Sequence, residues 1–208
     1  MNDDDDKNRF LLMLAHFNDE YQPANWFRDV TDPRVSPFAR PGEWPKQKKL
    51  VHIIAFCLLT NHFHLLLEET QDGGISKFMQ RLGTGMSCRH NLKYEEQGSL
   101  FQGSFRSRTV DRDSYLRYVI AYIQLKNPLD MYHGKIRSAK DFEKAYAWSC
   151  KYQYASLGDH AGEFNRPIIE RGALVDIFSP DEFKRFGKDF IEGRAFVSED
   201  GSGVVYFE

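Results

Sequence analysis

The chain has 208 residues, of which 41% are hydrophobic and 28% charged, and its net charge is −2. This composition is typical of a globular protein, no apolar stretch approaches the ~20 residues of a membrane span, and no basic-then-apolar leader is present. Three cysteines without a C-x-x-C pair argue against a disulfide framework or a cysteine-built zinc site, so we expect a cytoplasmic protein.

The first third of the chain predicts a helix, a loop and a hairpin. Asn8–Asn18 has apolar residues at helical spacing, and the acidic run Asp3–Asp6 ahead of it suits a helix N-terminus. Tyr21–Lys49 shows no clear period, which predicts a long loop. Two β-rich apolar runs, Leu50–Leu59 and His62–Glu69, are separated by Thr60-Asn61, which predicts a β-hairpin.

The remaining elements are mainly helical. We expect a helix at Lys77–Tyr94 capped by Ser76, and a loop at Gly98–Val110 that leads into a strand. A helix at Ser114–Leu125, capped by Asp111, should stop at Asn127-Pro128. Further helices are predicted at Asp141–Trp148 and Pro180–Ile191, followed by a loosely attached tail at Gly193–Glu208. This order predicts an α+β fold with an antiparallel sheet that carries helices on one face.

Two histidines stand out on the second predicted strand. Residues two apart on a strand point the same way, so His62 and His64 share a face and could hold a divalent metal. Ordinary sheet histidines give the same pattern, and Cys57 could join a zinc site or simply pack in the core.

The helix at Ser114–Leu125 carries Tyr115, Tyr118 and Tyr122 at spacings of three and four. Such tyrosines are usually core or interface residues, although a tyrosine can also be a covalent nucleophile. The segment from Gly74 to Pro128 has nine basic and four acidic residues, a local charge of +5, and this favours a face for a polyanion or a solvated helix surface.

Four ordered blocks together resemble the single-tyrosine HUH transposases, and most closely the REP-associated tyrosine transposases. The blocks are Asn61–Leu67 (NHFHLLL), Ser76–Leu82 (SKFMQRL), Gly98–Ser107 (GSLFQGSFRS) and Tyr115–Ile123 running on to Asn127-Pro128. The resemblance implies a ferredoxin-like sheet over residues 1–149, followed by a helical C-terminal extension over residues 150–208.

The resemblance also implies site residues and partners. His62 and His64 would bind Mg²⁺ or Mn²⁺, and Tyr122 would be the nucleophile, with Tyr118 in reserve. The substrate would be single-stranded or hairpin DNA, and the active protein a homodimer. The implied DNA-contacting residues are basic: Lys77, Arg81, Arg89, Arg106 and Arg108.

The chain departs from the family pattern in two places. The family has a polar third metal ligand one helical turn after the tyrosine. Here the residue four positions after Tyr122 is Lys126, and a protonated lysine cannot bind a metal ion. Gln124, two positions after Tyr122, points to another side of the helix. Asn127 at plus five is the expected ligand, provided that the helix unwinds locally before Pro128. The family's opening strand is also missing, which should expose unpaired strand edges unless another segment fills the gap.

Three functions follow from these observations. The first is metal-assisted, tyrosine-mediated cleavage and rejoining of DNA. The second is a DNA-hairpin-binding protein whose chemistry has decayed. The third is an RNA-binding sheet domain, but such a sheet would present aromatic residues where this one presents His62 and His64.

Overall fold

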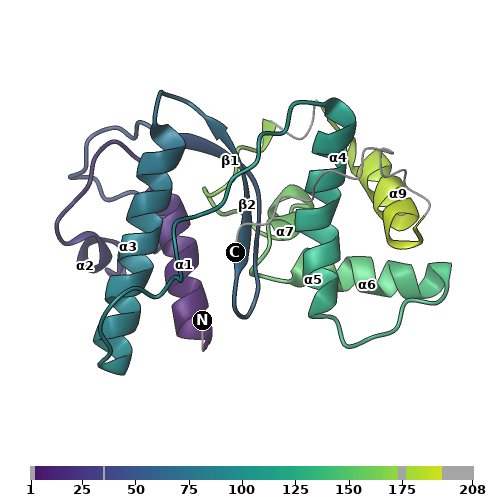
Figure 1. The fold of residues 1–208 in the computed structure, drawn as a ribbon, viewed down its shortest axis with the longest axis horizontal. Coiled ribbons are helices and arrows are strands. Elements are labelled where there is room, and N and C mark those ends of the chain that lie inside the picture. Colours follow the sequence, from purple (N-terminus) through teal and green to yellow (C-terminus); the bar gives the residue numbers. More distant parts are fainter. Residues whose placement is uncertain (1–2, 35, 173–176, 194–208) are drawn as a thin grey trace. The chain divides into compact units, whose positions relative to one another are not determined.

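The computed structural model describes residues 3–34, 36–172 and 177–193, and it contains two compact units (Figure 1). The first unit comprises Met1–His52, Leu67–Phe105 and Arg166–Ile168, and the second comprises Ile53–Leu66, Arg106–Asn165 and Ile169–Glu208. Each unit is therefore built from segments that are distant in the sequence. The predicted division at residues 149/150 stays a prediction.

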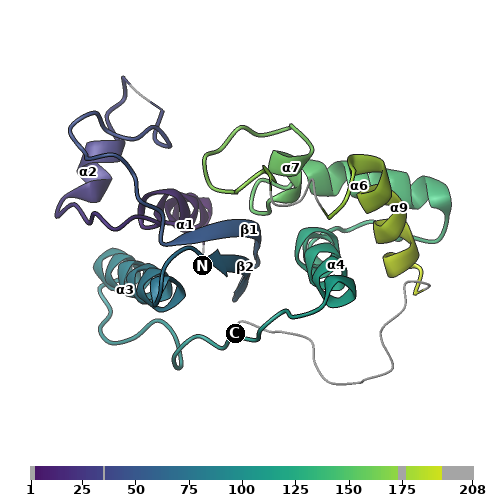
Figure 2. The same ribbon diagram turned by 90° about the horizontal axis from the view of Figure 1, so that it is seen from above.

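In the first unit, α1 (Asp4–His16) lies beside α3 (Gly74–Tyr94) in both ribbon views (Figures 1 and 2), and α2 (Trp26–Val30) interrupts the predicted loop. The helix α1 begins four residues earlier than predicted. The reason is its cap: the Asp3 carboxylate accepts the Asp6 N–H at 3.0 Å, and acidic residues in the first turn stabilise the positive end of the helix. Lys93 of α3 forms ion pairs with the same acidic turn, which ties the two helices together.

The start of α3 differs from the prediction. Gly73, not Ser76, is the N-cap residue, and it has φ of 72°, a conformation that glycine adopts without strain. At Gly74 a Cβ atom would lie 2.2 Å from the carbonyl oxygen of Leu50, so only glycine fits there. Gly73 and Gly74 therefore begin the helix.

The predicted hairpin is present as β1 (Val51–Leu58) and β2 (Phe63–Glu69), which pair in a two-stranded sheet. The Leu59 N–H donates to the His62 carbonyl at 2.9 Å and closes the turn at Thr60-Asn61. Together with the helices, this sheet confirms an α+β fold. The strand expected at the end of Gly98–Val110 is wrong, because residues 105–110 form no strand in the described chain.

The other edge of β1 is covered by a segment from late in the chain. Ala155 forms an antiparallel bridge with Cys57, and the Leu58 N–H donates to the Tyr154 carbonyl at 2.8 Å. Further along, the Glu170 N–H donates to the Ile53 carbonyl at 2.8 Å. Backbone groups along this edge of β1 thus find partners in the residues after α6.

Three consecutive helical segments of the second unit form one continuous helical rod, and the middle segment is a π-helix. In the rod, α4 (Asp113–Ala121) is followed by a π-helix, η1 (Tyr122–Lys126), and then by α5 (Asn127–Asp130). The predicted stop at Asn127-Pro128 is therefore wrong, and so is the predicted Asp111 cap, because Arg112 is the N-cap residue. Proline is tolerated in the first turn of a helix, which is where Pro128 stands in α5.

Three more helices complete the described part of the second unit: α6 (Ala139–Lys151), α7 (Leu157–His160) and α9 (Pro180–Ile191). The bounds of α9 are those predicted, and Ser179 and Glu182 form a capping box at its start. Strand and helices share one core, which includes Ile54, Ile120, Leu125, Phe142 and Phe183.

The predicted tail at Gly193–Glu208 lies outside the described residues, apart from Gly193. None of the described helices has the length and apolar character that a membrane crossing requires.

Candidate active site

The two predicted histidines lie together at the start of β2. His62 is half-buried just before the strand, whereas His64 inside the strand is 1% exposed. Their ring centroids are 5.0 Å apart, so both imidazoles can reach one small ligand between them.

A hydrogen-bond contact orients one of the two rings, and burial changes the pKa of the other. His62 Nδ1 lies 2.7 Å from Asn61 Oδ1; in the tautomer that donates Nδ1–H to this oxygen, the lone pair of Nε2 is left for a ligand. Burial, with a smaller contribution from His62, lowers the pKa of His64 to about 4. At neutral pH His64 is therefore an uncharged imidazole, the form that binds metals.

Of the three tyrosines in the rod, Tyr122 lies beside the histidines. Its ring centroid is 5.7 Å from that of His64. The ring of Tyr118 stacks on Tyr122 at 6.2 Å and contacts Phe190 of α9 at 5.1 Å. The second unit thus brings His62, His64 and Tyr122 together, with Tyr118 packed behind them.

The π-helix decides which residue follows Tyr122 on its face of the rod. The Asn127 N–H donates to the Tyr122 carbonyl, so the residue five positions on completes one turn, as the fourth residue would in an α-helix. This is the local unwinding that the sequence required of Asn127. Asn127 is 1% exposed, and its Nδ2 has no hydrogen-bond partner among the described residues.

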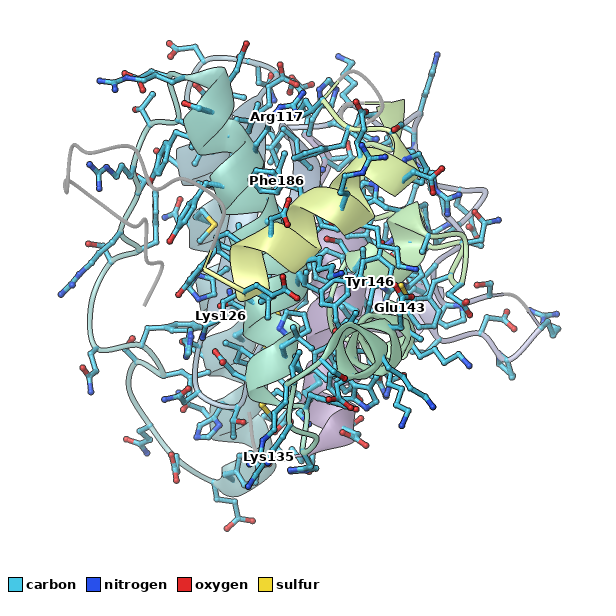
Figure 3. All side chains as sticks on the ribbon, turned by 90° about the vertical axis from the view of Figure 1, so that its right-hand side faces the viewer. Arg117, Lys126, Lys135, Glu143, Tyr146 and Phe186 are labelled. Carbon is cyan, nitrogen blue, oxygen red and sulfur yellow. The ribbon has the colours of Figure 1, made fainter. Side chains whose placement is uncertain are left out.

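Lys126 and Gln124, the other two polar residues after Tyr122, contact groups away from the two histidines. The Lys126 ammonium forms an ion pair with Asp130 at 2.7 Å. Gln124 is fully buried and lines a cavity of about 420 Å³ near α7 and the start of α9. In Figure 3, α9 crosses the rod with Phe186 and Arg117 near the crossing, and Lys126 lies further along the rod. The charge of Lys126, four positions after Tyr122, is thus balanced by Asp130 of the same rod.

The predicted DNA-binding residues fall into two groups. Arg106 and Arg108 belong to the second unit and are exposed in the segment before α4. Lys77, Arg81 and Arg89 lie on α3 of the first unit. Arg81 donates to the backbone carbonyls of Asp19 and Glu20, and Arg89 forms an ion pair with Asp5, so these two also hold the first unit together.

Two features of the site region were not foreseen from the sequence. The π-helix had one local signal, the spacing of five between Tyr122 and Asn127 next to a proline. The cover of β1 by residues 154–170 had none, because nothing in that segment has the period of a strand.

Comparison with known proteins gives one match. Residues 43–126 match the model of a family described as IS200-like transposases. No curated protein and no solved structure matches the chain. The matched residues include β1, β2, both histidines and Tyr122, and end one residue before Asn127. The segment that holds the histidine pair and the tyrosine is therefore similar to the IS200-like transposases.

Proposed function

We propose that the second unit cleaves and rejoins single-stranded or hairpin DNA through a covalent bond to Tyr122, with a divalent metal ion held by His62, His64 and Asn127. The observation that carries this proposal is that the three rings lie next to one another. The ring centroid of Tyr122 is 5.7 Å from that of His64, and the centroid of His64 is 5.0 Å from that of His62. The similarity of residues 43–126 to IS200-like transposases supports DNA as the substrate.

Tyr122 would act as the nucleophile. Its phenol oxygen, after losing a proton to solvent, attacks the phosphorus of a phosphodiester. A new O–P bond to tyrosine forms, the bond to one strand end breaks, and the departing oxygen takes up a proton. The energy of the phosphodiester is kept in the tyrosine ester, so attack by a strand hydroxyl can reverse the step and rejoin DNA.

The residues present fit a divalent ion. Two neutral imidazoles and one carboxamide oxygen are donors for an ion such as Mn²⁺, and Mg²⁺ is the other candidate. A half-turn of the Asn127 side chain exchanges its oxygen and nitrogen, so Oδ1 can occupy the position where Nδ2 has no partner. When bound, the ion would polarise the scissile phosphate and neutralise the charge that develops on it.

The decisive experiment is a search for the covalent adduct. Wild-type protein mixed with labelled single-stranded or hairpin DNA and Mn²⁺ should yield a protein–DNA band that survives denaturation. Tyr122→Phe removes one oxygen and should abolish that band while leaving DNA affinity almost unchanged. Tyr118→Phe is the matched control, and it should keep the adduct because its ring lies behind Tyr122.

Two outcomes would contradict the assignment. An adduct that persists in Tyr122→Phe and vanishes in Tyr118→Phe would make Tyr118 the nucleophile. A folded wild-type protein that binds DNA and forms no adduct with either metal would favour binding without chemistry. The homodimer expected from the family resemblance is measured by sedimentation of the full chain.

A further inference from the structure

A cavity of about 880 Å³ in the first unit is lined by α1, α3, the start of α2 and the segment that leads into α2. Ligand pockets in proteins have volumes of about 300–1,000 Å³, so it has room for a ligand of nucleotide size. Every residue that lines it belongs to the first unit, whereas His62, His64 and Tyr122 belong to the second.

One wall of the cavity is aromatic. Trp26 is half-buried and is held edge-on by Phe17, with ring centroids 4.8 Å apart, and by Phe27 at 5.5 Å. His16 lies 6.4 Å from the same indole. A large aromatic side chain held by its neighbours and lining a cavity is a surface on which a nucleic-acid base can stack.

The cavity is also strongly positive. Arg9, Lys77, Arg81 and Arg89 line it, and none of its described lining residues is aspartate or glutamate. Arg89 is paired with Asp5, and Arg81 with backbone carbonyls. The Arg9 guanidinium lies over the Phe27 ring and 5.6 Å from the centroid of Trp26, at the aromatic wall itself. Among the described residues Lys77 has no ion pair, so it is the least engaged of the four cations. Burial, and then the nearby Arg89, lower the pKa of Arg9 to about 10, so Arg9 is still a cation at neutral pH.

An aromatic wall with cations and no carboxylate is complementary to a flat base joined to a phosphate. We propose that this cavity binds one unpaired nucleotide of the DNA strand, with the base against Trp26 and its phosphate near Arg9 and Lys77. This inference rests on the proposed handling of single-stranded DNA. Duplex DNA is excluded as the occupant because its bases are already stacked and paired.

The chain carries its own reporter of occupancy. Cys88 lines the cavity and is exposed, whereas Cys57 and Cys150 are buried and burial raises the pKa of both thiols. A fluorescent iodoacetamide should therefore label Cys88 selectively. Labelling of the full-length protein is followed in EDTA with poly(dT) of about 20 residues, with a blunt duplex, or with the mononucleotide dTMP.

The proposal predicts that poly(dT) slows the labelling of Cys88 and that the duplex does not. Trp26→Leu should weaken poly(dT) binding about tenfold, the cost of one lost stacking contact. Trp26→Phe keeps a ring and should restore most of the affinity. The matched control is Trp148→Leu, in which a half-buried tryptophan of the second unit is changed in the same way without effect on binding. Lys77→Gln should reduce the salt dependence of log Kd by about 0.7, the value of one phosphate contact on a single strand.

Three results would overturn the inference. One is a folded Trp26→Leu protein that binds poly(dT) as the wild type does. A second is equal protection of Cys88 by duplex and by single strand. The third is binding of dTMP as tight as that of poly(dT), which would assign the cavity to a free nucleotide. All three readouts are independent of the Tyr122 adduct, so loss of cleavage alone would count only against the proposed function.

Discussion

One neighbour orients the His62 ring. Asn61 Oδ1 lies 2.7 Å from His62 Nδ1, on the side of the ring opposite the nitrogen proposed to bind metal. Hydrogen bonds of this type fix the tautomer and the orientation of a metal-binding histidine. Because Asn61 is exposed, its substitution should leave the fold intact.

Asn61→Ala is therefore expected to weaken Mn²⁺ binding about 10- to 100-fold, as for other residues that support a metal ligand. Mn²⁺ titration followed by electron paramagnetic resonance measures this directly, and the adduct yield at limiting Mn²⁺ should fall in parallel. His62→Ala is the reference for complete loss of the site. It is a cleaner reference than His64→Ala, since His64 is 1% exposed and its removal would also leave a cavity. Unchanged Mn²⁺ affinity in Asn61→Ala would mean that the Asn61 contact does not orient the ligand.

At the scale of the element, η1 acts as a one-residue insertion in a continuous helical rod. A π-turn accommodates an extra residue while the helix on each side keeps its own face. Here the extra residue places Asn127, and not Lys126, one turn after Tyr122.

Deletion of Lys126 tests this interpretation. The shortened rod should become α-helical throughout, with Asn127 four positions after Tyr122 and on the same face. We expect the adduct to be retained and the circular dichroism to show an undiminished helical signal. Deletion of Arg117 is the matched control, because it removes one exposed residue from α4, where no bulge can absorb the change. That deletion rotates the flanking turns by about 100° and should abolish both the adduct and cooperative unfolding. Loss of the adduct in a well-folded Lys126 deletion would show that the π-turn itself is required.

The segment that covers β1 depends on a close contact between α6 and α7. At Gly158 a Cβ atom would lie 2.3 Å from the Cys150 carbonyl oxygen and 2.5 Å from the Phe164 ring. Backbone cannot move aside as easily as the end of a side chain. Gly158 therefore fixes how closely the chain can turn back toward β1.

Gly158→Ala should lower the free energy of unfolding by about 1–3 kcal/mol, as expected for overpacking in a close-packed region. Urea denaturation measures this change. Gly42→Ala serves as the control, because nothing lies within 4 Å of a Cβ atom there, and it should be neutral or stabilising by up to about 1 kcal/mol. Equal stability of the two variants would contradict the close packing of α7 on α6.

At the scale of the whole molecule, each unit contains a histidine whose pKa the fold lowers: His16, which is buried, and His160, which is half-buried. His16 Nε2 lies 2.8 Å from the Pro37 carbonyl, and His160 Nε2 lies 3.0 Å from the Ile54 carbonyl. Burial lowers the pKa of both histidines below the ordinary value of 6.5. The unfolded chain therefore binds protons at these positions before the folded chain does.

The free energy of unfolding should consequently fall as the pH drops below about 6.5, where the unfolded histidines become protonated. Above that pH the contribution of these groups is constant. Urea denaturation between pH 7 and pH 5 measures the slope, and each group can contribute at most about 1.4 kcal/mol per pH unit. His160→Gln keeps a side chain that can donate to the Ile54 carbonyl but cannot titrate, so its slope should be shallower than that of the wild type. An unchanged slope would show that His160 does not contribute.

The sequence alone determined those features that depend on residues close together in the chain. The hairpin followed from two apolar runs around Thr60-Asn61, and α9 from its helical residue pattern. The pairing of His62 with His64 followed from the two-residue period of a strand. Tyr122 was singled out because it precedes Asn127-Pro128 within a family motif, and the match over residues 43–126 supports the same family. These signals are local, since helix caps, strand periods and turns involve only a few neighbouring residues.

Tertiary structure decided the rest, because partners distant in the sequence leave no local pattern. The family resemblance predicted unpaired strand edges, but only the fold shows that residues 154–170 provide partners for β1. Asn127 follows Tyr122 by five residues, and an α-helix would place it on a different face from Tyr122. The structure shows that a π-turn brings it one turn after Tyr122. The cavity around Trp26 joins residues from α1, α2 and α3, and its chemistry exists only where the folded first unit brings their side chains together.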